Sequence, residues 1–142
     1  MKRELLSYLC CPNCSKELEL YVEGSKEDEI ITGSLQCTRC MLIYPILHAI
    51  PRFVSPSVSS EVRRTTKNFG DQWHRFDAAV APTQFASVEL FADFIKPVTS
   101  KYFRDKCVLD VGCGLGRFCM LAHEFGAATV VGMDLSNRLT VA

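Results

Sequence analysis

The sequence of 142 residues contains no long hydrophobic run, and a membrane-spanning helix is therefore not expected. The longest mostly apolar stretch, Met41–Leu47, is far shorter than the roughly 18 residues that such a helix needs. Glu4 interrupts the leucine-rich N-terminal stretch, and no small-residue cleavage site follows it, so we expect no export signal. These features predict a cytoplasmic protein without a membrane span.

The chain also lacks a surplus of charge of either sign, with 16 basic and 16 acidic side chains. A nucleic-acid-binding domain usually carries a basic surface, so the composition does not indicate nucleic acid as a partner. No internal repeat is visible, and hydrophobic residues make up 48% of the chain. This composition is typical of a globular protein and excludes a disordered tail or a fibrous chain.

Cysteine is abundant, with eight residues in all. Two Cys-x-x-Cys pairs are separated by 22 residues and comprise Cys11, Cys14, Cys37 and Cys40. Thiolates in two such turns close a tetrahedral sphere around Zn²⁺, and a site with four thiolates has no open position for chemistry. Disulfides or unrelated buried thiols are the alternatives, and the paired spacing in a reducing compartment disfavours both. We predict a structural zinc site, in which Cys10 is the competitor of Cys11.

Residues 1–54 are predicted to form one small domain built as a ribbon of hairpins. The polar run GSKEDE predicts the first hairpin turn, and Pro45 is expected to end the last strand. Such a ribbon has too little core to be stable unaided. The expected elements are a helix at Lys2–Leu9 and strands at Leu18–Val22, Ile30–Gln36 and Met41–Tyr44.

The motifs LLSYLCCPNC, LQCTRC and YPILHAIPRF resemble the zinc-ribbon domain related to the small activator subunit of tRNA and release-factor methyltransferases. That domain also occurs fused to methyltransferase domains. The resemblance covers about the first 54 residues, and it implies a protein partner that binds through the ribbon. One departure is Ala49, where the family usually has Gly.

A second domain is expected over residues 83–142, after a linker and lead-in segment at 55–82. The linker begins with the Ser- and Pro-rich run SPSVSS. A helix is predicted to open at Pro82, and its apolar side comprises Phe85, Val88, Phe91, Phe94 and Ile95. Further on, the sequence predicts one strand, helix, strand unit of a parallel sheet, with elements at Cys107–Val111, about Arg117–Phe125 and Thr129–Met133.

A glycine-rich loop at residues 112–116 follows the first strand of this unit and opens its helix. Glycines in this position let the backbone approach a ligand and present amide groups to it. Asp134 ends the next strand 22 residues after Gly112, where a carboxylate can accept hydrogen bonds from both hydroxyls of a ribose. The pattern therefore predicts a nucleoside-containing cofactor.

Two residues favour S-adenosylmethionine over a dinucleotide. The dinucleotide motif needs a third small residue where this chain has Arg117. Asp110 would repel a pyrophosphate, whereas its negative charge suits the cationic amino group of S-adenosylmethionine. Methyl transfer depends mainly on alignment of the acceptor with the activated methyl group, so no catalytic side chain is assigned.

The stretches VLDVGCGLGRF and VVGMDLS resemble motif I and the following acidic position of class I S-adenosylmethionine-dependent methyltransferases. The segment NFGDQWHRF resembles one that often precedes that domain. The methyl acceptor is not identified by any of these motifs. The resemblance implies cofactor contacts from Asp110, Gly112, Cys113, Gly114, Gly116, Asp134 and Leu135.

Together these patterns predict an α/β protein, in which a small β-rich zinc ribbon precedes the start of a doubly wound, Rossmann-like parallel sheet. A doubly wound sheet needs several strand, helix, strand units, and the last 37 residues provide for one. We therefore expect a truncated methyltransferase without turnover of its own. The alternatives are a non-enzymatic zinc-ribbon interaction module and, less favoured, an NAD-dependent oxidoreductase.

Overall fold

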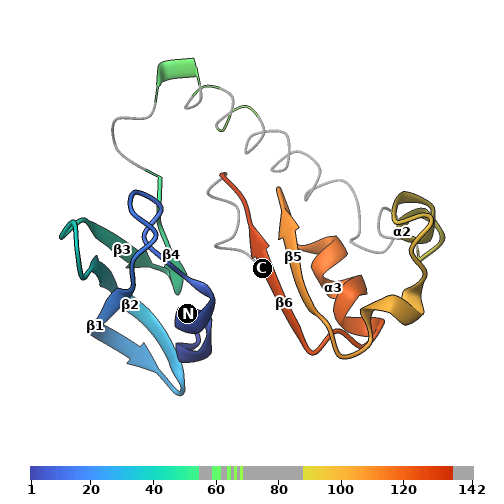
Figure 1. The fold of residues 1–142 in the computed structure, drawn as a ribbon, viewed down its shortest axis with the longest axis horizontal. Coiled ribbons are helices and arrows are strands. Elements are labelled where there is room, and N and C mark those ends of the chain that lie inside the picture. The colour runs from blue at the N-terminus through green and yellow to red at the C-terminus, as the bar shows by residue number, and fades with distance from the viewer. Residues whose placement is uncertain (55–58, 62–63, 65, 67, 69–87, 136–142) are drawn as a thin grey trace. The chain divides into compact units, whose positions relative to one another are not determined.

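The computed structural model describes residues 1–54, 59–61, 64, 66, 68 and 88–135 of the chain (Figure 1). The chain divides into two compact units, Met1–Ser57 and Val58–Ala142. The start of the SPSVSS linker, the expected helix start at Pro82 and residues 69–76 of the NFGDQWHRF segment lie outside the described residues. The predicted domain bounds stay predictions. Within the described residues, no helix has the length and apolar character that a membrane crossing requires.

The first unit is an antiparallel sheet preceded by a short 3-10 helix, η1 (Arg3–Tyr8). Its core is small and is formed mainly by Leu18, Ile30, Leu35 and Ile46, which pack with the buried thiols of the ribbon. The strands lie side by side in sequence order: β1 (Leu18–Lys26), β2 (Glu29–Cys37), β3 (Ile43–Leu47) and β4 (Ile50–Pro51).

The hairpin between β1 and β2 is tighter than the sequence predicted. The prediction that the whole GSKEDE run forms the turn was wrong, because Gly24, Ser25 and Lys26 belong to β1. Lys26 pairs with Glu29, so two residues suffice for the turn, and Glu27 adopts a positive φ of 53°. Register shifts around Gly24 adjust the pairing of the longer strands. The first half of the polar run thus extends strand β1 and does not form a turn.

Pro45 lies inside β3 and does not end it, which corrects a second expectation. The residue pairs with Ser34 of β2, and its carbonyl oxygen accepts the N–H of Arg52 at 2.8 Å. The nitrogen and carbonyl of one strand residue point to the same side, so the missing N–H of Pro45 faces β4 and removes no hydrogen bond to β2. The third strand therefore runs on to Leu47.

The described part of the second unit contains a strand, helix, strand arrangement, as the sequence predicted. The parallel register places Cys107 opposite Thr129 and Val111 opposite Met133. The helix between the strands ends at Glu124, one residue before the expected end. The elements are α2 (Val88–Phe94), the 3-10 helix η3 (Ser100–Phe103), β5 (Cys107–Val111), α3 (Arg117–Glu124) and β6 (Thr129–Met133).

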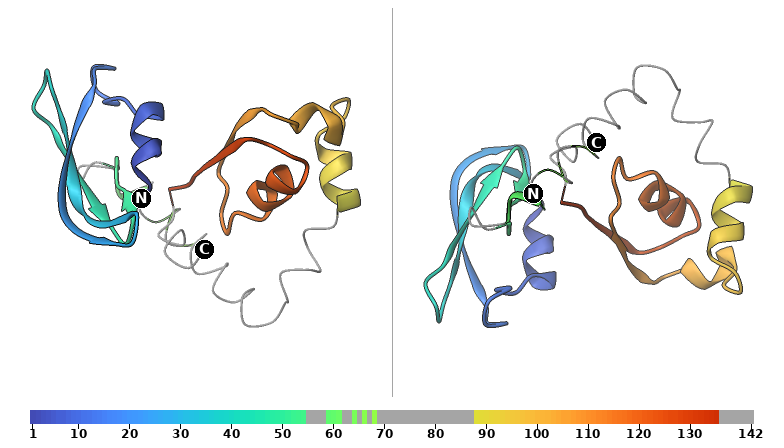
Figure 2. Two further views of the ribbon diagram at one scale, coloured as in Figure 1. Left: turned by 90° about the horizontal axis from the view of Figure 1, so that it is seen from below. Right: turned by 90° about the horizontal axis from the view of Figure 1, so that it is seen from above.

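The helix α3 covers one face of the β5–β6 sheet (Figure 2). Phe91 of α2 is the centre of an aromatic cluster on this side, with its ring centroid 5.1 Å from that of Phe118. On the other face Leu109 and Val111 are 59% and 70% exposed. A mainly apolar cleft of about 450 Å³ runs beside β5. That this sheet is part of a larger, Rossmann-like parallel sheet stays a prediction.

Candidate metal centre and glycine-rich loop

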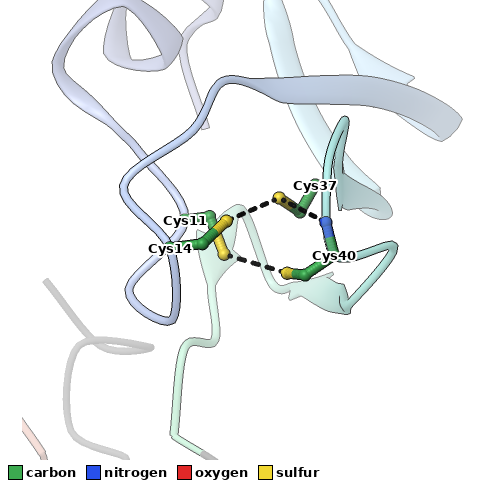
Figure 3. A group of neighbouring side chains, drawn as sticks. All are labelled: Cys11, Cys14, Cys37 and Cys40. Carbon is green, nitrogen blue, oxygen red and sulfur yellow. Dashed lines mark hydrogen bonds between the residues drawn. The ribbon is translucent and has the colours of Figure 1, made fainter.

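Four cysteine sulfurs converge in the first unit (Figure 3). All four Sγ atoms lie within 4.8 Å of one another, with 3.5 Å between Cys11 and Cys40 and 3.4 Å between Cys14 and Cys37. A disulfide bond would bring two sulfurs to about 2.0 Å. Four thiolates at tetrahedral positions around zinc would lie about 3.8 Å apart, given a Zn–S distance of about 2.3 Å. The donor set therefore fits a structural zinc ion.

Cys10 does not take part in this cluster. Its side chain is exposed, whereas Cys11 is fully buried. Within the described residues, no other group of three or more potential metal ligands gathers. The alternative between Cys10 and Cys11 is thus decided in favour of Cys11 as a member of the cluster. That the cluster binds zinc stays a prediction.

The two Cys-x-x-Cys turns have the same local structure. In each turn the first cysteine donates its N–H to the carbonyl five residues later, at 2.8 Å for Cys11 and 2.9 Å for Cys37. Its own carbonyl accepts the N–H four residues later, at 2.7 and 3.2 Å. The residues that end the turns, Ser15 and Met41, both adopt a positive φ, of 55° and 60°. Two equivalent turns therefore present their sulfurs to a common centre.

The surroundings of Cys11 favour its thiolate form. Burial raises the pKa of this thiol, but the Tyr44 hydroxyl and the backbone N–H groups of Asn13 and Cys14 together lower it to about 6. The Tyr44 hydroxyl lies 3.3 Å from the Cys11 sulfur. This hydrogen bond, followed by burial, raises the pKa of Tyr44, so the phenol stays protonated and acts as the donor. Tyr44 itself packs against Phe53, with ring centroids 5.0 Å apart.

The surroundings of Cys37 and Cys14 shift the pKa values of these two thiols in opposite directions. Burial raises the pKa of Cys37, but the backbone N–H groups of Cys40 and Arg39, each 3.4 Å from its sulfur, give a net lowering. At Cys14 the Lys16 N–H lowers the pKa, but burial and the neighbouring thiols raise it to about 11. Because negative charge on two sulfurs hinders ionisation of a third, a metal ion bound between the sulfurs would favour deprotonation of the whole cluster.

The glycine-rich loop (residues 112–116) joins β5 to α3 in the second unit. Gly112, Gly114 and Gly116 adopt φ values of 82°, 55° and 75°, which residues with side chains rarely adopt. A Cβ atom built on Gly112 or Gly116 would meet no atom within 4 Å. The loop backbone therefore borders open space, as a binding site for a ligand requires.

Asp134 lies beside this loop, at the end of β6. Its Oδ2 atom accepts the N–H of Gly114 at 2.9 Å, and the Met133 carbonyl accepts the N–H groups of Gly112 and Cys113 at 2.7 and 3.1 Å. One oxygen of the carboxylate is thus already bonded to the loop, which the sequence did not indicate. The predicted role, in which the carboxylate accepts both ribose hydroxyls, stays a prediction. The next residue, Leu135, is 59% exposed.

A contact that the sequence did not predict involves Asp110, two positions before the loop. The Cys119 thiol in α3 donates to Asp110 Oδ2 at 3.3 Å. Desolvation and this hydrogen bond raise the pKa of Cys119 to about 12, so the thiol stays protonated. Desolvation, followed by the charges of Asp110 and Asp134, also raises the pKa of Cys113. The pKa values of Cys113 and Cys119 are therefore raised, whereas those of the buried Cys11 and Cys37 are lowered.

Comparison with known proteins shows which protein family the first unit resembles. Residues 2–46 match the profile of the family described as Trm112p-like protein. The first unit contains a Trm112p-like domain. The chain of the Haloferax volcanii Trm112 methyltransferase activator, solved in complex with a putative methyltransferase, is 41% identical; the match covers 42% of this chain and 100% of that chain, with a TM-score of 0.39.

Curated relatives of the chain are methyltransferases. Protein arginine N-methyltransferase 1 of Dictyostelium discoideum is 52% identical over 42 residues, which is 30% of this chain and 12% of the relative. Ribosomal protein L11 methyltransferase of Methylobacillus flagellatus is 36% identical over 63 residues, or 44% of this chain and 19% of the relative. The matched parts of the chain thus span 12% and 19% of the length of these two relatives.

The four-cysteine cluster leads to a prediction on metal content. The chain should bind one equivalent of zinc, and a Cys37→Ser, Cys40→Ser double variant should lose it together with the fold of the Trm112p-like domain, because two of four ligands are removed. Native mass spectrometry with metal analysis measures the stoichiometry. Cys10→Ser is the matched control and should retain the metal. A metal-free chain with a folded ribbon would contradict this prediction.

The Tyr44 hydroxyl leads to a second prediction. Tyr44→Phe removes one donor to the Cys11 sulfur and leaves the ring contact with Phe53 in place. Loss of a partner that hydrogen-bonds a metal ligand typically lowers metal affinity about 10- to 100-fold. Competition for zinc with a chelator at constant pH measures this change. Tyr21→Phe, which removes the hydroxyl of an exposed tyrosine on β1, should leave the affinity unchanged.

Proposed function

We propose that the Trm112p-like domain is a non-enzymatic interaction module, held together by a zinc ion, that binds and supports a methyltransferase. The observation that carries this proposal is the closed set of four cysteine ligands within a Trm112p-like domain. A zinc ion with four thiolates stabilises the fold and has no coordination position for a substrate. The domain then acts through its surface.

An apolar surface next to the second cysteine turn supports this role. Met41, Leu42 and Ile43, called the turn patch below, are 59%, 45% and 62% exposed. The Met41 N–H donates to the Cys37 carbonyl at 3.2 Å, and the Leu42 carbonyl accepts the Cys37 N–H at 2.9 Å. The metal-binding turn thereby fixes the backbone of the patch. Three consecutive exposed apolar side chains on a fixed backbone are suited to contact with a protein partner.

The turn patch can be tested with a methyltransferase as partner. A Met41→Ser, Ile43→Ser double variant should bind at least about tenfold more weakly, because apolar anchors at the centre of an interface carry most of its binding energy. Binding to the putative methyltransferase of the Haloferax volcanii complex, measured by calorimetry, gives the affinity.

The control for this experiment is Val22→Ser on β1, an exposed apolar residue on the strand at the edge of the sheet. It should bind like the wild type, and both proteins should contain one zinc ion. Wild-type protein that binds no methyltransferase would contradict the proposed function. Equal binding by the double variant would place the contact on another surface.

We further propose that the second unit is the start of a Rossmann-like S-adenosylmethionine-binding domain, so that the complete protein is a methyltransferase. The open backbone of the glycine-rich loop, with acids at the ends of both strands, supports this second function. The cofactor would supply an activated methyl group. The residues that would hold it are Asp110, Gly112, Cys113, Gly114, Gly116, Asp134 and Leu135.

Asp134 gives the test of this second function in the complete gene product. Asp134→Ala should weaken S-adenosylhomocysteine binding roughly 10- to 150-fold, because hydrogen bonds to a charged group are worth about 1.5 to 3 kcal/mol. Asp134→Asn should have a smaller effect, since the amide keeps one acceptor oxygen for the Gly114 N–H. Calorimetric titration measures both affinities.

Zinc content should be the same in all these variants, and Glu124→Ala, which removes an exposed carboxylate at the end of α3, is the matched control. NAD titrated in parallel should not bind. Preference for NAD, or unchanged affinity in Asp134→Ala, would mean that the loop does not bind S-adenosylmethionine in the proposed way.

A further inference from the structure

The carboxylate of Asp110 has an unusual set of neighbours at the interface between β5 and α3. It is partly buried, and no described Lys, Arg or His forms an ion pair with it. Its hydrogen-bond partner is the thiol of Cys119, which donates to Oδ2 at 3.3 Å. The negative charge of a carboxylate attracts a cationic ligand.

The neighbouring strand makes space for this contact. Gly132 of β6 lies directly opposite Asp110 in the parallel register. A Cβ atom on Gly132 would come within 2.9 Å of the Cys113 sulfur and 3.1 Å of the Cys119 sulfur. A side chain at this position would therefore displace the thiol from the carboxylate. The glycine on β6, the thiol on α3 and the acid on β5 form one packed arrangement.

We propose that Cys119 is a positioning residue, which holds the Asp110 carboxylate in the orientation that binds the amino group of the methionine moiety of S-adenosylmethionine. This inference rests on the proposed cofactor of the second unit. The thiol donates a hydrogen bond to Oδ2 and thereby restricts rotation of the carboxylate. The raised pKa of Cys119, about 12, keeps that proton in place across the neutral range. Cys119 does not touch the cofactor and acts only through Asp110.

Two ligands separate this role from a general effect on the fold. S-adenosylhomocysteine carries the amino group, whereas 5′-methylthioadenosine has the same nucleoside and sulfur but lacks the amino acid part. In the complete gene product, Cys119→Ala should weaken S-adenosylhomocysteine about 3- to 10-fold, the range of one net hydrogen bond, and change 5′-methylthioadenosine by less than about twofold. Cys119→Ser retains a donor and should restore most of the lost affinity.

Two further variants complete the calorimetric experiment. Asp110→Asn should reproduce the selective loss for S-adenosylhomocysteine, and Cys107→Ala, an exposed cysteine on the same strand, should bind both ligands like the wild type. Equal losses for both ligands in Cys119→Ala, or no loss where Asp110→Asn shows one, would overturn the positioning role. A wild-type protein that binds neither ligand would instead remove the proposed cofactor, so the two failures are distinguishable.

Discussion

Four cysteine sulfurs lie within 4.8 Å of one another in a unit whose core contains few large apolar side chains. Two of the thiols favour ionisation, and Cys14 is held protonated by burial and by its neighbours against the effect of the Lys16 N–H. A cation at the centre of the cluster would neutralise its thiolates. The two equivalent turns and the turn patch are built around this one cluster.

The two units differ in the kind of site that they offer. The Trm112p-like domain has a closed set of ligands, and its exposed feature is the apolar turn patch. The second unit has a loop whose backbone borders open space and whose Gly114 N–H is bonded to Asp134. The first site is enclosed by its own side chains, whereas the second is an open backbone loop. The face of β5 with Leu109 and Val111 is exposed, whereas parallel sheets usually have both faces covered by helices.

Cysteine serves two different chemical purposes in this chain, and the surroundings decide which. Backbone N–H groups and a tyrosine hydroxyl donate to the buried sulfurs of Cys11 and Cys37 and lower their pKa values. Near the glycine-rich loop, desolvation and a hydrogen bond to the Asp110 carboxylate raise the pKa of Cys119. The first environment favours the thiolate, the form that a metal ion binds, and the second keeps the thiol protonated as a hydrogen-bond donor.

Local patterns in the sequence were enough to predict the paired cysteines, the glycine-rich loop and the bounds of β5 and β6, because spacing and hydrophobic periodicity are properties of neighbouring residues. Contacts across strands were decided only in the tertiary structure. The choice of Cys11 over Cys10 follows from which thiol points into the core, and Pro45 is tolerated because its missing N–H faces away from β2. The Asp134 contact with Gly114 and the Cys119 contact with Asp110 join residues that a linear pattern does not relate, since they meet only when β6 and α3 pack on β5.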